Sequence, residues 1–177
     1  MRQRSRNGLV ISAIAVIGLV AMAFAAEMPF GGDKDVAFGN KLWAEMGDYT
    51  DWPMKSDVYE GRSPHGKFLR MYYNVVNVDG KPYHVIVKDN FGGPDMATVT
   101  ANPSEYLGAV TVMVQREDGY DPDNNDWYYV KYKADGSIEK NPEGVALAGR
   151  VGKGAEKGCV PCHNQAKDDD FLFSNDR

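Results

Sequence analysis

Phe-Leu-Arg-Met-Tyr-Tyr-Asn-Val-Val at residues 68–76 is followed by Tyr-His-Val-Ile-Val-Lys at residues 83–88. Both runs are rich in aromatic and β-branched side chains, which favour β-strands. Between them, Asp79-Gly80 is a typical two-residue hairpin turn. The two runs are therefore predicted to form an antiparallel pair, and this pair decides the fold class.

Two more strands are predicted after this hairpin. Residues 108–116 and 127–133 repeat its aromatic and β-branched composition. The stretch between them, residues 118–126, contains glycine, proline and two asparagines and is predicted to be a loop. Asp135-Gly136 supplies a second tight turn after the last strand.

Helical patterns are few. Residues 35–46 have apolar side chains at helical spacing, with Asp35 as a candidate N-cap and Gly47 after the last turn. Residues 155–162 are predicted to form a short helix near the C-terminus, although Pro161 weakens that pattern. We therefore expect an α+β, mainly β domain with a curved antiparallel sheet of about four or five strands.

Strand alternation assigns faces to the first two strands. Leu69, Met71 and Tyr73 share one face of their strand, and Arg70 lies on the other. Lys88 shares a face with Ile86 in the second strand. Cations among apolar neighbours usually need an anion, so Arg70 and Lys88 are either solvated rim residues or residues that face a pocket.

Cys159, Cys162 and His163 form a Cys-x-x-Cys-His motif. Two thiols at this spacing can each add to one haem vinyl group, and the adjacent histidine then binds the iron. A zinc site would need two histidines from His65, His84 and His163 beside both cysteines, and a thioredoxin-like pair would need a βαβ context. The motif therefore predicts one covalently bound haem c with His163 as axial ligand.

The position of this motif restricts the iron's sixth ligand. Only 14 residues follow His163, and none of them is methionine. A sixth ligand, if one is present, must come from upstream, and Met71, Met113 and His65 are the candidates. Each also has a simpler interpretation, as a core residue for the two methionines and as a turn residue for His65.

The N-terminus is typical of a secretory signal peptide. Arg2, Arg4 and Arg6 precede an uncharged apolar run, and Ala23-Phe24-Ala25 has the small-x-small pattern of a cleavage site. We predict a signal peptide at residues 1–25, a single haem domain at residues 26–177 and a periplasmic location. A retained membrane anchor is the alternative. The formal charge of −5 disfavours nucleic acid as a partner.

Together these residues resemble the cytochrome P-460 family and its close relative, cytochrome c′-beta. The matching pieces follow the family order and cover most of the chain after the N-terminal segment. They are Trp52-Pro53, Pro64-His65-Gly66, Leu69-Arg70-Met71-Tyr72, Val85-Ile86-Val87-Lys88, Gly119-Tyr120-Asp121-Pro122 before Trp127, and Cys159-Val-Pro-Cys-His163.

This resemblance implies a mainly antiparallel β domain, a homodimer and a five-coordinate c-type haem with an open distal site. In the enzymatic members a lysine is joined covalently to a meso carbon of the porphyrin, and Lys88 matches that lysine. Arg70 matches a pocket arginine. The implied activity is oxidation of hydroxylamine or related small nitrogen species, with electrons passed to a partner cytochrome.

The chain departs from the enzymatic pattern at Thr111. A carboxylate that helps proton transfer in the enzymatic members should fall there, but no acid lies between Glu105 and Glu117. An apolar distal wall suits a neutral diatomic ligand. Two alternatives to the enzyme therefore stay open: a protein that binds nitric oxide or carbon monoxide without turnover, and a simple electron carrier.

Overall fold

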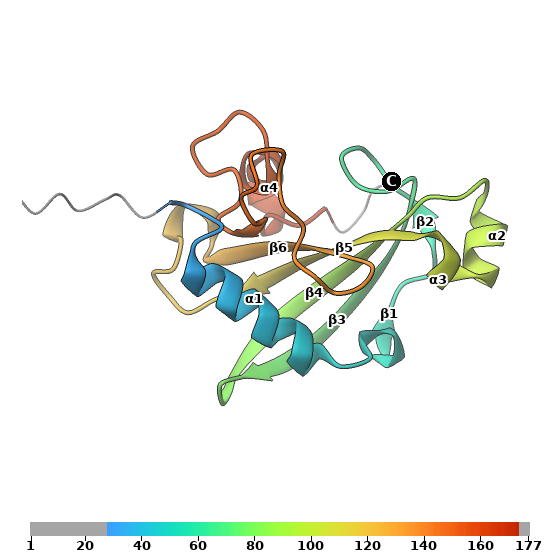
Figure 1. Ribbon diagram of the computed structural model, residues 1–177, viewed down its shortest axis with the longest axis horizontal. Helices are drawn as coiled ribbons and strands as arrows, with labels where there is room; N and C mark the ends of the chain where they lie inside the picture. The colour runs from blue at the N-terminus through green and yellow to red at the C-terminus, as the bar shows by residue number, and fades with distance from the viewer. Residues whose placement is uncertain (1–27, 174–177) are drawn as a thin grey trace, which may run out of the picture.

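The computed structural model describes residues 28–173, and its centre is a long β-hairpin (Figure 1). Strand β3 (Phe68–Val78) pairs with β4 (Lys81–Phe91) in antiparallel register over all eleven residues of each. Asp79 and Gly80 join them with φ of 53° and 79°, as a two-residue turn with left-handed central residues requires. The predicted hairpin is confirmed, and both strands extend beyond the predicted ends.

The hairpin belongs to a seven-stranded antiparallel sheet. Its order is β1-β3-β4-β5-β6-β7, and β2 also pairs with β3. The remaining strands are β1 (Met54–Lys55), β2 (Tyr59–Glu60), β5 (Leu107–Gln115), β6 (Trp127–Lys133) and β7 (Ala148–Gly149). The mainly antiparallel architecture is thus confirmed. The sheet is open and uncurled where we expected a curved one. It has seven strands and not four or five, because three two-residue strands, β1, β2 and β7, were not predicted.

Helices are few and short, apart from α1. They are α1 (Asp33–Met46), α2 (Met96–Ala101), α3 (Pro103–Tyr106) and α4 (Cys159–His163), with 3₁₀ turns η1 (Tyr49–Asp51), η2 (Pro122–Asn124) and η3 (Asn164–Asp169). Helix α1 begins two residues before the predicted start, with Gly32 and not Asp35 at its N-cap. The predicted helix at residues 155–162 is wrong in extent, since α4 begins only at Cys159.

The loop predictions are confirmed. Residues 118–126 connect β5 and β6 with only the single 3₁₀ turn η2. Asp135-Gly136 forms a turn in which Gly136 N–H donates to the Lys133 carbonyl at 3.0 Å. Within residues 28–173 no helix combines the length and hydropathy needed to cross a membrane. The predicted signal peptide at residues 1–25 lies outside the described residues.

The two faces of the sheet are covered by different parts of the chain (Figure 1). Helix α1 packs on one face, where Leu42 and Met46 join a buried cluster with Tyr72, Val85 and other sheet residues. We call this the core face. The segment that contains α4 packs on the opposite face, where Val160 joins a smaller buried cluster of sheet side chains. We call this second side the cavity face.

Candidate functional site

A large cavity lies between the cavity face and the C-terminal segment. Its volume is about 1120 Å³, which exceeds the roughly 300–1,000 Å³ of most small-ligand pockets. Side chains from β3, β4, β5 and β6 form its floor, and α4 and the residues after it form a wall. The cavity can therefore hold a large cofactor together with a small ligand.

Cys159, Cys162 and His163 all line this cavity. Both cysteines are free thiols. Burial raises the pKa of the Cys159 thiol to about 12, with a further contribution from Cys162. Gly158, just before the motif, has φ of 139°, and a Cβ there would lie 2.7 Å from the Gly152 Cα. Glycine at this position lets the chain turn tightly into α4.

His163 is buried, and its ring orientation is fixed. Its Nδ1 lies 2.6 Å from the Phe171 carbonyl oxygen. Because a carbonyl only accepts hydrogen bonds, Nδ1 carries the proton and Nε2 carries the lone pair. Metal-binding histidines typically donate their second ring nitrogen to such an acceptor. Tyr129 and Phe173 pack on the ring, with centroids 5.2 and 5.4 Å away.

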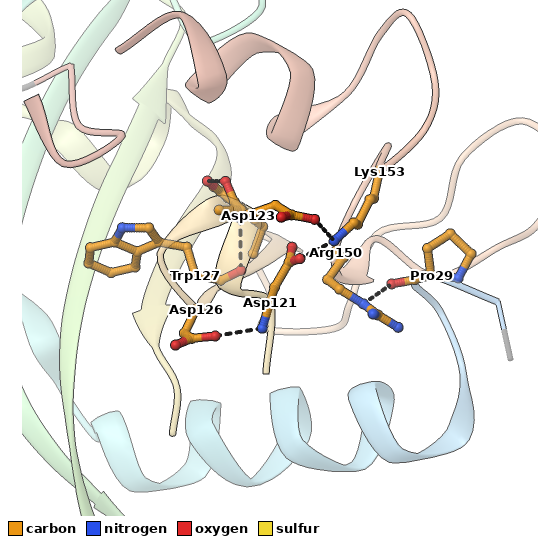
Figure 2. A network of polar contacts seen from close by, with 9 residues as sticks. Pro29, Asp121, Asp123, Asp126, Trp127, Arg150 and Lys153 are labelled. Atoms are coloured by element: carbon orange, nitrogen blue, oxygen red, sulfur yellow. Dashed lines mark hydrogen bonds and ion pairs between the residues drawn. The ribbon is translucent and has the colours of Figure 1, made fainter. Parts of the chain in front are cut away.

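Polar contacts join the segment that carries the motif to the loop between β5 and β6 and to the start of β6 (Figure 2). The Lys153 ammonium donates to the Asp121 carboxylate, which is only 1% exposed. The indole of Trp127 donates to the Asp170 carbonyl at 3.1 Å. A buried carboxylate needs such a counter-charge, so these contacts hold the wall of the cavity against the sheet.

Lys88 also lines the cavity and is only 9% exposed. It lies on β4 opposite Met71 on one side and Thr111 on the other. Thr111 lines the cavity as well, and Met113 and Ile86 add apolar surface nearby. The acidic side chains in the lining are Glu139, whose carboxylate is 2.9 Å from Lys131 Nζ, and Glu156.

Arg70 lies on the other side of the sheet. The register pairs Arg70 with Asp89 and Met71 with Lys88, and cross-strand partners project to the same face. Arg70 therefore shares the core face with Tyr72 and Asp89, and it is not among the cavity-lining residues. The structure brings Lys88 to the haem motif but separates Arg70 from both, so the side-chain position gives no support to a pocket role for Arg70.

The three candidate sixth ligands, His65, Met71 and Met113, all line the cavity. His84 lies outside it, 2.5 Å from the Tyr73 hydroxyl. Among residues 28–173, no group of three or more His, Cys, Asp or Glu side chains is arranged to hold a metal ion.

Sequence reasoning missed Asn90, which contacts both the His65 turn and Lys88. Its Oδ1 is 2.9 Å from His65 Nδ1, and its Nδ2 donates to the Lys88 carbonyl at 2.7 Å. Alternation from Lys88 could have placed Asn90 on the cavity face, because the two residues are two apart on β4. Its contact with His65 could not be found that way, because the two residues lie on separate segments.

These features fit a c-type haem. The cavity has the size for a large cofactor, two free thiols at the required spacing face it, and the tautomer of His163 leaves Nε2 as the metal-binding nitrogen. Cys159 and Cys162 would hold the ring and His163 the iron.

Comparison with known proteins agrees with this fit. The family model for cytochrome P460 matches residues 47–174 of this chain. Neither the curated proteins nor the solved structures include a match. The matched range contains the whole hairpin, β5, β6 and the Cys-x-x-Cys-His motif.

Proposed function

This chain belongs to the cytochrome P460 family and is thus a c-type haem protein, and on that premise we propose that it oxidises hydroxylamine or a related small nitrogen species in the periplasm. The haem supplies the binding position for the nitrogen species and accepts its electrons. The observation that carries the proposal is that Lys88 and the Cys-x-x-Cys-His residues line one cavity.

Within this proposal the chain's own residues have distinct roles. Cys159 and Cys162 hold the cofactor covalently, and His163 binds the iron through Nε2, which the Phe171 carbonyl orients by accepting from Nδ1. The apolar side chains of Ile86 and Met113 keep bulk water from the ligand position. Electrons leave to a partner cytochrome, and the protein acts as a homodimer.

Lys88 is the candidate for a covalent bond to a porphyrin meso carbon. That bond replaces one N–H and one meso C–H, so its formation removes two electrons and two protons and needs an oxidant such as a peroxide. The position of Lys88 supports this role, because its residue is only 9% exposed and the side chain lines the cavity. The neutral amine is the nucleophilic form of a lysine.

A second candidate function is reversible binding of nitric oxide or carbon monoxide without turnover. Thr111 stands opposite Lys88, where the enzymatic pattern has an acid, and Met71, Ile86 and Met113 provide apolar cavity surface. Of the two acids in the lining, Glu139 is already paired with Lys131. A wall of this kind suits a small neutral ligand better than a reaction that releases protons.

Steady-state oxidation of hydroxylamine by the purified holo-protein tests the choice between the two. The enzyme predicts turnover with an artificial electron acceptor, together with a red-shifted ferrous Soret band. The gas-binding protein predicts an ordinary ferrous spectrum, carbon monoxide binding and no turnover.

Tryptic mass spectrometry tests the Lys88 bond directly. The peptide that ends at Lys88 spans residues 71–88, because trypsin cleaves after Arg70 but not between Lys81 and Pro82. Trypsin does not cleave after a substituted lysine, so a crosslinked protein lacks the free peptide and instead yields residues 71–116 joined through the haem to the Cys159 peptide. Lys88→Arg is the matched control, since it keeps the charge and lacks a primary amine. Release of the free, unmodified peptide from the wild-type protein would favour the gas-binding function.

A further inference from the structure

We propose that Trp127 and Asn125 are positioning residues for His163. Both side chains contact Asp170, and the next residue, Phe171, supplies the carbonyl that accepts from His163 Nδ1. Through this carbonyl they set how strongly the ring of His163 donates electrons to the iron of a bound haem. This inference rests on the haem of the proposed function but not on hydroxylamine oxidation.

The backbone that presents this carbonyl has an unfavourable conformation. Asp170 and Phe171 are both left-handed, with φ of 56° and 61°. Aspartate adopts this conformation more readily than most residues, but a bulky residue such as phenylalanine is a genuine outlier there. Such a conformation persists only where the surrounding structure holds it. The contacts that hold residues 170 and 171 therefore also decide where the Phe171 carbonyl points.

The contacts that hold these two residues come largely from the other end of the cavity wall. The indole N–H of Trp127 donates to the Asp170 carbonyl at 3.1 Å, and Asn125 Nδ2 donates to the Asp170 carboxylate. The N–H of Phe171 donates to the Ala166 carbonyl at 2.8 Å. The Phe171 side chain is buried in one cluster with Trp127. The loop between β5 and β6 and the start of β6 thus hold the strained residues on two sides.

This loop is itself held by internal hydrogen bonds. Asp126 Oδ1 accepts from Asp121 N–H at 2.7 Å (Figure 2). Asn124 is only 1% exposed, and its Oδ1 accepts from the Tyr129 hydroxyl at 3.1 Å. The ring of Tyr129 packs on the ring of His163. The loop therefore acts on His163 by two routes, at Nδ1 through the Phe171 carbonyl and at the ring through Tyr129.

The hydrogen bond at Nδ1 has a chemical consequence at Nε2. A histidine that donates one ring nitrogen to a fixed acceptor is more basic at the other nitrogen. A more basic ligand stabilises ferric iron relative to ferrous iron and so lowers the reduction potential of the haem. If Trp127 and Asn125 keep the Phe171 carbonyl in place, their loss weakens this hydrogen bond and raises the potential. A role in stability alone would leave the potential unchanged.

Spectroelectrochemical titration of the holo-protein tests the proposal. Trp127→Phe keeps an aromatic ring in the buried cluster and lacks the indole N–H. Asn125→Gly lacks the amide and still allows the left-handed backbone at this position, where φ is 48°. We expect Trp127→Phe to shift the ferric–ferrous equilibrium about tenfold toward the ferrous form, which is about 59 mV for one electron. Asn125→Gly should shift it in the same direction.

Resonance Raman spectra of the ferrous holo-protein give a second measurement. The iron–histidine stretching frequency should fall in both variants, because a weaker hydrogen bond at Nδ1 makes His163 a weaker ligand. Trp52→Phe is the matched control. It removes the indole of a tryptophan that is only 8% exposed and belongs to the core-face cluster. It should leave the potential and the frequency at their wild-type values.

The proposal is overturned if Trp127→Phe and Asn125→Gly have the wild-type potential and iron–histidine frequency. Their contacts with Asp170 would then support the cavity wall without acting on His163. A fall in potential would equally contradict it. Asn125 is exposed, so Asn125→Gly carries the test if Trp127→Phe does not fold. A wild-type protein that shows these shifts in its variants but does not turn over hydroxylamine contradicts the enzyme and supports the positioning role.

Discussion

Alternate side chains of strand β4 lie in two different environments, a packed core on one face of the sheet and a cavity on the other. Val85, Val87 and Asp89 project to the core face, and Ile86, Lys88 and Asn90 project to the cavity face. On the core face, protein atoms fill the space, and both valines are fully buried. On the cavity face, the side chains surround a volume of about 1120 Å³. Side chains on the core face are buried by packing against other side chains, and those on the cavity face are buried by the enclosure of the cavity.

Polar groups show the same contrast. Asp89 on the core face accepts from Tyr49 Oη at 2.7 Å and from Tyr72 Oη at 3.1 Å, so its oxygens are satisfied by protein donors. Burial raises the pKa of Asp89, and the two tyrosines and Arg70 oppose that shift. Asn90 on the cavity face instead orients a histidine that lines the cavity. Core-face groups stabilise the fold, and cavity-face groups position other side chains.

The largest expected effect comes from a truncation on the core face. Leu42 of α1 is fully buried against the sheet, and Leu42→Ala should lower the free energy of unfolding by about 2–5 kcal/mol. Urea denaturation monitored by circular dichroism measures this loss. A loss below about 1 kcal/mol would contradict a filled core between α1 and the sheet.

Removal of one hydrogen bond to Asp89 should have the next largest effect. Tyr49→Phe leaves the buried carboxylate with one donor fewer, and a hydrogen bond to a charged group contributes about 1.5–3 kcal/mol. Tyr73→Phe is the matched control, because the Tyr73 hydroxyl bonds the exposed His84. It should change the unfolding free energy by no more than about 0.5 kcal/mol. Equal losses in the two variants would remove the distinction between the faces.

The pKa of Asp89 predicts a pH dependence of stability. A carboxyl group whose pKa is raised on folding binds its proton more tightly in the folded state. Its stabilising contribution is complete below the unfolded pKa of about 3.9 and is lost as pH rises through the folded pKa. We therefore expect Asp89→Asn to gain stability relative to wild type as pH rises, measured by urea denaturation between about pH 4 and pH 8. A relative stability that is constant or falls with pH would refute this assignment.

The smallest stability change is expected on the cavity face. Ile86→Ala widens a cavity that already exists. It should therefore lower the free energy of unfolding by less than about 2 kcal/mol, the lower end of the range for such truncations in a packed core. The same variant should change the absorption spectrum or ligand affinity of the holo-protein, whereas Leu42→Ala should leave both unchanged. An Ile86→Ala loss as large as that of Leu42→Ala would show that protein atoms fill this face as well.

Much of the sheet could be predicted because its signals are local. Strand β6 has the predicted bounds, and the Asp79-Gly80 turn joins β3 and β4 as expected. The prediction ended β4 at Lys88 and left out the polar residues Asp89 and Asn90. The strand continues to Phe91 because Tyr49, Tyr72 and the His65 turn supply their partners. Those partners come from separate segments, which local patterns do not join.

The position of Arg70 could have been predicted and was not. A two-residue turn at Asp79-Gly80 pairs Val78 with Lys81, and counting back along the ladder pairs Arg70 with Asp89 and Met71 with Lys88. The opposite faces of Arg70 and Lys88 follow from that register alone. In contrast, no local pattern could place His65 beside His163 or the Phe171 carbonyl against its ring, because these contacts depend on how the C-terminal segment crosses the sheet.

The division of the sheet into two faces has a consequence for how the protein is assembled. The cluster between α1 and the sheet consists of side chains from residues 36–148, all of which precede the haem-attachment motif in the chain. The core-face contacts thus need neither the motif nor the cofactor that it binds. The buried cluster that supports the sheet is therefore complete without residues 159–163, and we expect a variant that lacks both cysteines of the motif to keep this core.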